Sequence, residues 1–248
     1  MKLSETTSVI VTGGASGLGA AVVEAFVSLG VPVGVLDMNA PTLDVPFEKC
    51  DVTDADGVGR ALNALRSENG QERICVNCAG IAPAAKTVSR GAAHDPGLYA
   101  KVIGINLIGT FNVASQSAAG MVTATPLNED GERGVIINTA SIAAFEGQMG
   151  QSAYASSKAG VAGLTLPMAR DLAKAGVRVV AIAPGIFASP MVTAFPQDVQ
   201  DALALSAEFP KRLGAPKEFA DLVAHIATNP MLNGSVIRLD AGTRMQAQ

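Results

Sequence analysis

Apolar and polar positions along this chain fall into blocks of two lengths. Short runs of aliphatic, often β-branched residues, such as SVIVT and VPVGVLD, are typical of buried strands, and the longer segments between them repeat apolar residues at helical spacing. The runs that predict strands are residues 8–12, 31–37, 46–52, 73–80, 134–141, 177–185 and 235–242. The clearest predicted helices are residues 19–30, 54–69, 96–120 and 152–175, with a kink expected at Pro167.

Strands that alternate with helices predict an α/β fold, a Rossmann-type doubly wound parallel sheet of seven strands with helices on both faces. No linker and no internal repeat divides the chain, so we expect one domain over residues 1–248. The longest stretch outside the alternation is residues 186–216, which is apolar and follows a strand end. We therefore predict that this segment, called the lid below, covers a substrate.

Composition narrows the class of protein. Of 248 residues 48% are hydrophobic but only 4% aromatic, so the predicted core is aliphatic. The net charge is −4 and no run of lysine or arginine occurs, so no nucleic-acid partner is expected. The first residues resemble neither a signal nor a transit peptide, and no apolar segment looks long enough to span a bilayer. We expect a cytoplasmic protein without a membrane partner.

The three cysteines are Cys50, Cys75 and Cys78. The CVNC stretch matches a metal or redox pattern, but it lies in a predicted strand, where residues three apart point to opposite faces. The two histidines, His94 and His225, are isolated, so no zinc set is evident and no metal is expected.

A glycine-rich turn, VTGGASGLG, joins the first strand to the first helix. Gly13, Gly17 and Gly19 allow the backbone to approach a pyrophosphate at the helix N-terminus, although a plain tight connection is an alternative. Asp37 ends the second strand, where a carboxylate can accept hydrogen bonds from ribose hydroxyls and repel the extra phosphate of NADP. A turn aspartate is the alternative, but together with the glycine turn this position favours NAD.

Two further strand ends are expected at the same edge of the sheet as the glycine turn and Asp37. Asp51 and Val52 follow the third strand, and the small residues Cys78, Ala79 and Gly80 follow the fourth. Each is compatible with an ordinary turn, but the carboxyl ends of parallel strands are where open α/β sheets bind ligands.

Tyr154 and Lys158 are four positions apart and share one face of a predicted helix. A nearby ammonium and a positively charged nicotinamide favour phenolate, so the pKa of Tyr154 is expected below its usual value near 10. Such a tyrosine can exchange a proton with an alcohol or carbonyl oxygen, with Ser141 holding that oxygen and Asn106 steadying a water. An exposed tyrosine–lysine pair is the alternative reading.

These motifs together resemble the short-chain dehydrogenase/reductase family along essentially the whole chain. The likeness rests on the turn from Thr12 to Gly19, on NCAG at 77–80, on Asn106, Ser141, Tyr154 and Lys158, and on Pro184 and Gly185. The resemblance implies that Asn106, Ser141, Tyr154 and Lys158 are the catalytic tetrad and that Lys158 also binds the nicotinamide ribose.

Stretches such as VNCAGIA, AAFEGQ and NPMLNGSVIRLD are similar to one subfamily, the type 2 3-hydroxyacyl-CoA dehydrogenases. That likeness implies an acyl-CoA substrate of fatty-acid and branched-chain amino-acid breakdown, a homotetramer paired through the helix at 152–175, and Gln148 beside the substrate. The implied NAD contacts are Ser16, Leu18, Asp37, Asp51, Val52, Cys78, Tyr154, Lys158, Phe187 and Ser189. Residues 82–100 depart from the subfamily near the expected CoA end.

Two other functions stay open from the sequence. A hydroxysteroid or other secondary-alcohol dehydrogenase fits the apolar lid residues, which are Phe187, Met191, Val192, Phe195 and Phe209. A non-catalytic scaffold subunit is the third possibility, against which the complete tetrad argues.

Overall fold

The central sheet is built from seven parallel strands in the order β3-β2-β1-β4-β7-β8-β9. The computed structural model describes residues 1–247, except the side chain of Met191. The strands are β1 (Ser8–Thr12), β2 (Val33–Asp37), β3 (Phe47–Lys49), β4 (Glu72–Asn77), β7 (Gly134–Thr139), β8 (Val177–Pro184) and β9 (Val236–Leu239). All seven predicted strands are confirmed, and most end earlier than expected because their last residues turn into loops.

The strand order places the ligand crevice. From β1 the chain adds β2 and β3 on one side, then crosses to build β4, β7, β8 and β9 on the other. The loops that follow β1 and β4 therefore leave the sheet in opposite directions, which opens a crevice between them at the carboxyl edge.

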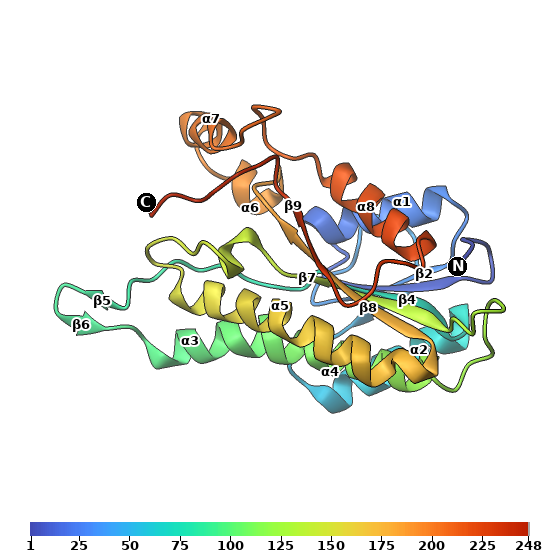
Figure 1. The fold of residues 1–248 in the computed structure, drawn as a ribbon. Helices are drawn as coiled ribbons and strands as arrows, with labels where there is room; N and C mark the ends of the chain where they lie inside the picture. Colours follow the sequence, from blue (N-terminus) through green and yellow to red (C-terminus); the bar gives the residue numbers. More distant parts are fainter. Residues whose placement is uncertain (248) are drawn as a thin grey trace.

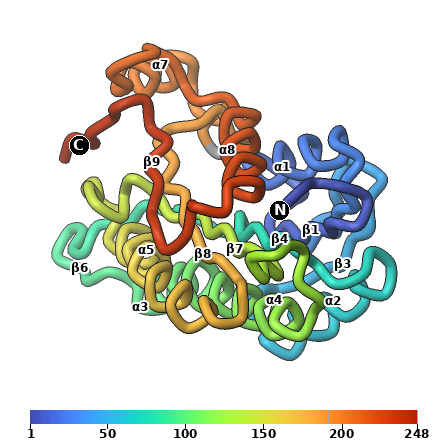
Figure 2. Tube along the Cα trace, turned by 45° about the vertical axis from the view of Figure 1, so that its right-hand side comes forward, coloured from blue at the N-terminus to red at the C-terminus, as the bar shows by residue number. Residues whose placement is uncertain are grey.

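Helices cover both faces of the sheet, as predicted (Figures 1 and 2). One face packs against α1 (Gly17–Ser28) and α8 (Pro216–Thr228), with Phe26 and Phe219 fully buried. The other face packs against α2 (Ala55–Asn69), α4 (Thr110–Met121) and α5 (Ser152–Leu172). Helix α2 illustrates the reason, because its buried residues Val58, Ala61, Leu62 and Leu65 form one helical stripe, while polar and small residues occupy the other positions.

The predicted helix at 96–120 is observed as α3 (Pro96–Ile103), a π-helical segment (Gly104–Gly109) and α4. The joined helix Pro96–Met121 is long and apolar enough, by length and composition, to cross a membrane, with a mean hydropathy of 1.2. The expectation that no segment reaches that length is therefore wrong. Length and composition do not distinguish a span from a core helix, and this helix buries Val102, Val113 and Met121.

Other elements were not expected from the sequence. The lid folds into α6 (Pro190–Thr193) and α7 (Gln197–Leu205), and residues 88–93 form a small hairpin of β5 (Val88–Ser89) and β6 (Ala92–Ala93). Helix α5 continues through Pro167 without a break. Cys75 packs into the core under α4 while Cys78 packs toward the opposite core cluster, so the expectation of opposite faces is confirmed.

Candidate active site

Asn106 sits in the π-helical segment between α3 and α4 and is fully buried. Its Oδ1 accepts a hydrogen bond from the Ile81 amide at 2.9 Å, and its Nδ2 donates to the Ile81 carbonyl at 2.9 Å and to Ser157 Oγ at 3.0 Å. A π-helical turn is rare and is often found at functional sites. Here it aims Asn106 between the loop after β4 and helix α5. Because both amide protons are bound by protein, any water that Asn106 steadies must contact its oxygen atoms.

Ser141 lies just past the end of β7 and caps a short 3₁₀ turn, Ile142–Ala144. Its Oγ accepts a hydrogen bond from the Ala143 amide at 3.1 Å, and the side chain is 7% exposed. The capping bond uses the hydroxyl as an acceptor only. Its proton can therefore be donated, either to the Tyr154 oxygen in the chain by itself or to a substrate oxygen, and the second role stays a prediction.

Tyr154 stands in the first turns of α5, half-buried. Burial raises the pKa of its phenol, and hydrogen bonding with Ser141 opposes that rise only in part. The chain by itself therefore does not lower this pKa, and the expected lowering, which includes the charge of the nicotinamide, stays a prediction. The physical reason is desolvation, which outweighs every attraction that the protein supplies to the phenolate.

Lys158 is 5% exposed, and its ammonium donates a hydrogen bond to the Thr139 carbonyl at 2.7 Å. The Nζ atom lies 5.8 Å from the centre of the Tyr154 ring, on the same side of α5. Burial lowers the pKa of Lys158 from 10.5 to about 8. The lysine is thus charged at neutral pH, although it is buried.

The loop after β4 connects the predicted cofactor site to the predicted catalytic tetrad. A Cβ on Gly80 would lie 3.2 Å from Asn106 Oδ1 and 3.7 Å from Lys158 Nζ. On the other side, the amides of Cys78 and Ala79 each donate to Thr12 Oγ1 at 3.1 Å. The residues of NCAG therefore link the end of β1 to the tetrad, and their small size is a requirement of space.

The glycine turn fits a dinucleotide phosphate. Gly13 has φ of +67°, and a Cβ there would lie 2.8 Å from the Ala79 amide nitrogen, while a Cβ on Gly19 would overlap the Gly13 carbonyl oxygen. Ser16 is the N-cap of α1, and within the described chain its side chain makes no capping bond. A backbone cradle of this kind at a helix N-terminus is suited to an anion.

Asp37 ends β2 beside that turn. Its Oδ2 accepts a hydrogen bond from the Ala15 amide at 3.0 Å, and its Oδ1 accepts one from the Asn39 amide at 3.0 Å. Each oxygen keeps a further lone pair, so the carboxylate can both hold the turn and accept a ribose hydroxyl. The two interpretations of Asp37, as a turn aspartate and as a ribose-binding residue, are therefore compatible.

Asp51, Val52 and Ser189 are further predicted cofactor positions. Asp51 Oδ1 accepts from the Thr53 amide and hydroxyl at 2.9 and 2.8 Å, and the Val52 carbonyl accepts from Asn112 Nδ2 at 3.0 Å. Ser189 is the N-cap of α6, and its Cβ lies 3.6 Å from where a Cβ of Gly17 would stand. The start of the lid thus closes over the glycine turn, which supports its predicted position there.

For three further predicted positions, the structure shows contacts that the sequence did not indicate. These positions are Phe187, Gly185 and Gln148. The Phe187 ring is 6% exposed and packs edge-on against Phe219 at 6.4 Å, so it is a core side chain and not an exposed lid surface. The Gly185 amide donates to the Leu239 carbonyl at 2.9 Å, which ties the Pro184–Gly185 end of β8 to β9. Gln148 Nε2 donates to the Gln246 carbonyl at 3.2 Å, a contact that no sequence motif signals.

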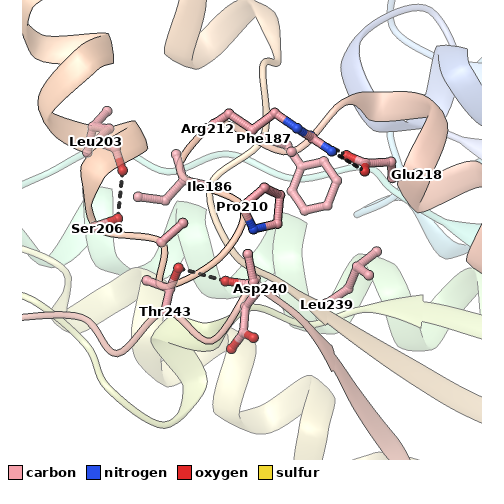
Figure 3. Close-up of a pocket in the computed structure, with 13 residues that line it drawn as sticks. Ile186, Phe187, Leu203, Ser206, Pro210, Arg212, Glu218, Leu239, Asp240 and Thr243 are labelled. Atoms are coloured by element: carbon pink, nitrogen blue, oxygen red, sulfur yellow. Dashed lines mark hydrogen bonds and ion pairs between the residues drawn. The ribbon is translucent and has the colours of Figure 1, made fainter.

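A cavity of about 200 Å³ lies against the lid, and Figure 3 shows the residues that line it. Apolar side chains such as Ile186, Phe187 and Leu239 make most of its wall. Arg212 and Glu218 form a bidentate ion pair at its edge, at 2.8 and 2.7 Å. Neither Ser141 nor Tyr154 lines this cavity, so it is distinct from the point of chemistry.

The glycine cradle, the strand-end aspartate and the Ser–Tyr–Lys group at one edge of a doubly wound sheet define a nicotinamide dinucleotide oxidoreductase. The family model described as short chain dehydrogenase matches residues 7–200. The chain belongs to the short-chain dehydrogenase family.

Named relatives extend this result over the whole chain. A 3-hydroxyacyl-CoA dehydrogenase type-2 from Bos taurus is 48% identical, covering 96% of this chain and 95% of its own. The crystal structure of 3-hydroxyacyl-CoA dehydrogenase type-2 from Mycobacterium avium superimposes with a TM-score of 0.93 and 41% identity, over 100% of both chains. The ipsdienol dehydrogenase of Ips pini is 34% identical, covering 95% of this chain and 96% of its own.

Proposed function

We propose that this oxidoreductase interconverts 3-hydroxyacyl-CoA and 3-ketoacyl-CoA thioesters of short or 2-methyl-branched chain, with NAD as cofactor. One observation carries the choice of substrate. Relatives named 3-hydroxyacyl-CoA dehydrogenase type-2 are 46–48% identical to this chain over 95–96% of its length. The groups that reduction of a ketone requires converge in the site, which supports the reaction class.

NAD supplies the hydride acceptor when bound; the protein supplies proton transfer and orientation. The Ser141 hydroxyl donates its proton to the substrate oxygen, while Tyr154 exchanges a proton with it. Because burial raises the pKa of Tyr154, the chain alone keeps the phenol, the form that donates a proton to a ketone. Oxidation requires phenolate, which the positive charge of NAD in its oxidised form would favour.

The preference for NAD over NADP is proposed from Asp37. Its carboxylate is anchored to the Ala15 amide beside the glycine turn, where the adenosine ribose belongs. An extra phosphate on that ribose would face a fixed negative charge. The neighbouring Met38 and Asn39 offer no cationic side chain to receive the phosphate.

We also propose a homotetramer located in the cytoplasm that acts in fatty-acid and branched-chain amino-acid breakdown, without membrane or nucleic-acid partners. Ile108 and Phe111 are about half exposed on the α4 side, and Leu166 is 44% exposed on α5, which suits pairing of these helices between subunits. The free thiols Cys50, Cys75 and Cys78 suit a reducing compartment. Sedimentation of the purified protein measures the assembly, and a monomer would contradict the proposal.

The test compares substrates on one preparation by NADH absorbance. We expect kcat/KM to be highest for acetoacetyl-CoA and 2-methylacetoacetyl-CoA, with modest discrimination between them, because each methylene in an apolar pocket is worth about 1–3 kcal/mol. Tyr154→Phe should lower kcat about 10²–10⁴-fold. The other tyrosine of the chain, Tyr99, stands on α3 against His94, so Tyr99→Phe is the matched control and should keep normal turnover.

A secondary-alcohol or hydroxysteroid dehydrogenase is the second candidate. Phe195, Leu205 and Phe209 on the lid are 48%, 66% and 84% exposed, a surface that any apolar substrate body can cover. A keto-steroid preferred about tenfold or more over both thioesters would favour this candidate. Normal turnover by Tyr154→Phe would remove this residue from the mechanism, and no turnover by the wild type would favour the scaffold.

A further inference from the structure

Residues 240–247, called the strap below, run from the end of β9 and contact both the lid and the loop between Ser141 and Tyr154. At the lid, the amides of Glu208 and Phe209 donate to the Ala241 carbonyl at 2.9 and 3.2 Å. At the loop between Ser141 and Tyr154, the Met149 amide donates to the Ala247 carbonyl at 3.0 Å. The strap therefore contacts two walls that are far apart in the sequence.

The loop wall is fixed to the strap through Glu146. Its carboxylate accepts hydrogen bonds from Arg238 Nη1 at 2.9 Å, from Arg238 Nη2 at 3.1 Å and from the Met245 amide at 3.2 Å. Arg244 adds an ion pair to Glu146 at 3.5 Å. A bidentate arginine–carboxylate pair has strict geometry, so it sets the position of the loop as well as holding it.

Arg238 joins the same network to the strap. Its Nε donates to Asp240 Oδ2 at 2.7 Å, its Nη2 donates to the Thr243 carbonyl at 2.9 Å, and its guanidinium stands 5.5 Å from the centre of the Phe145 ring. Arg238 and Glu146 are 24% and 25% exposed. Arg238 holds the pKa of Glu146 below its usual range, so the pair is ionised at neutral pH.

We propose that Arg238 and Glu146 are positioning residues that hold the wall bearing Phe145, Gln148 and Met149 against the acyl-CoA substrate. This inference rests on the proposed function for the identity of the substrate. Neither residue touches the tetrad, so the chemical step does not depend on them. Their loss should weaken the binding of the acyl-CoA without changing the step that follows.

The test is Glu146→Gln, which keeps the size of the side chain and removes its charge. We expect KM for acetoacetyl-CoA to rise about tenfold, while kcat stays within about threefold of wild type, because binding is lost equally from ground and transition states. KM for NAD should not change. The double variant Glu146→Gln with Arg238→Gln should raise KM no further than the larger single effect, since either change alone already breaks the pair between these two residues.

The matched control breaks a similar bidentate pair at the opposite edge of the sheet. Arg66 binds Glu72 at 2.8 and 2.7 Å near the start of β4. Arg66→Lys should lower Tm but leave both KM values at wild-type levels. The same rise in the acetoacetyl-CoA KM in this control, or a comparable change in KM for NAD in Glu146→Gln, would show a general loss of structure and overturn the proposal.

Amide hydrogen exchange tests the positioning role of Glu146 independently of which substrate the enzyme uses. Glu146→Gln should speed exchange across residues 145–149, including the Met149 amide, while Arg66→Lys should not. If wild type fails to turn over any acyl-CoA, the substrate proposal falls but the exchange result still tests the positioning. Unchanged exchange and unchanged KM in Glu146→Gln would overturn the positioning role.

Discussion

Replacing Lys158 with methionine measures by how much the buried ammonium lowers the free energy of unfolding. Lys158 is 5% exposed, and burial lowers its pKa from 10.5 to about 8. At about 1.4 kcal/mol for each pKa unit, the folded protein disfavours the charged form by about 3 kcal/mol relative to the unfolded chain. Methionine has a similar length and carries no charge, so it removes this cost.

The substitution also removes the hydrogen bond to the Thr139 carbonyl, which is 2.7 Å long. Leaving that acceptor without its partner costs about 1–3 kcal/mol. The variant should therefore be more stable than wild type by up to about 2 kcal/mol at neutral pH, which raises Tm by up to roughly 8 °C for a chain of this size. Turnover should be lost at the same time.

The pH dependence gives the stricter test. Between about pH 8 and 10.5 the unfolded chain keeps a proton on Lys158 that the folded protein has released, so wild-type stability gains from rising pH across this window. The variant lacks that gain. Its advantage should be largest below pH 8 and should shrink by about 3 kcal/mol toward pH 10.5, where it becomes the less stable protein.

Thermal unfolding of both proteins by circular dichroism, at pH values from 7 to 10, gives the difference directly. Other groups that titrate in this range are common to both proteins and cancel in the difference. An advantage that stays constant from pH 7 to 10, or a variant less stable than wild type at pH 7, would refute the reasoning.

Two further predictions concern charged groups outside the tetrad. Asp37→Ser combined with Met38→Arg removes the repelling carboxylate and supplies a cationic partner for the extra phosphate of NADP. The ratio of kcat/KM with NADP to kcat/KM with NAD should therefore rise. A wild type that already prefers NADPH would contradict this interpretation. The ion pair with Arg212 lowers the pKa of Glu218 to about 2, so its stabilising effect is present above its ordinary value near 4.5 and is lost as the pH falls toward 2. Glu218→Gln should therefore lower Tm at pH 6 but not near pH 2, and an equal deficit at both pH values would count against the pair.

The sequence by itself determined the order of elements and most of the chemistry-bearing residues. Strand runs such as residues 8–12 and 134–141 are visible because a fully buried parallel strand needs apolar side chains on both faces. The glycines of the turn and the pair Tyr154 and Lys158 were also predictable. Their spacing is local, and a backbone cradle or a shared helical face follows from spacing alone.

Tertiary structure decided what depends on contacts between distant segments. The bonds from Asn106 to Ile81 and Ser157, and those from the strap to Glu146 and the lid, join residues with no shared periodicity. In the chain by itself the pKa of Tyr154 is raised, because spacing shows the nearby ammonium but not the degree of burial, and desolvation outweighs the attraction. Burial is a property of the packed molecule, so sequence spacing could name the reacting groups but not their protonation.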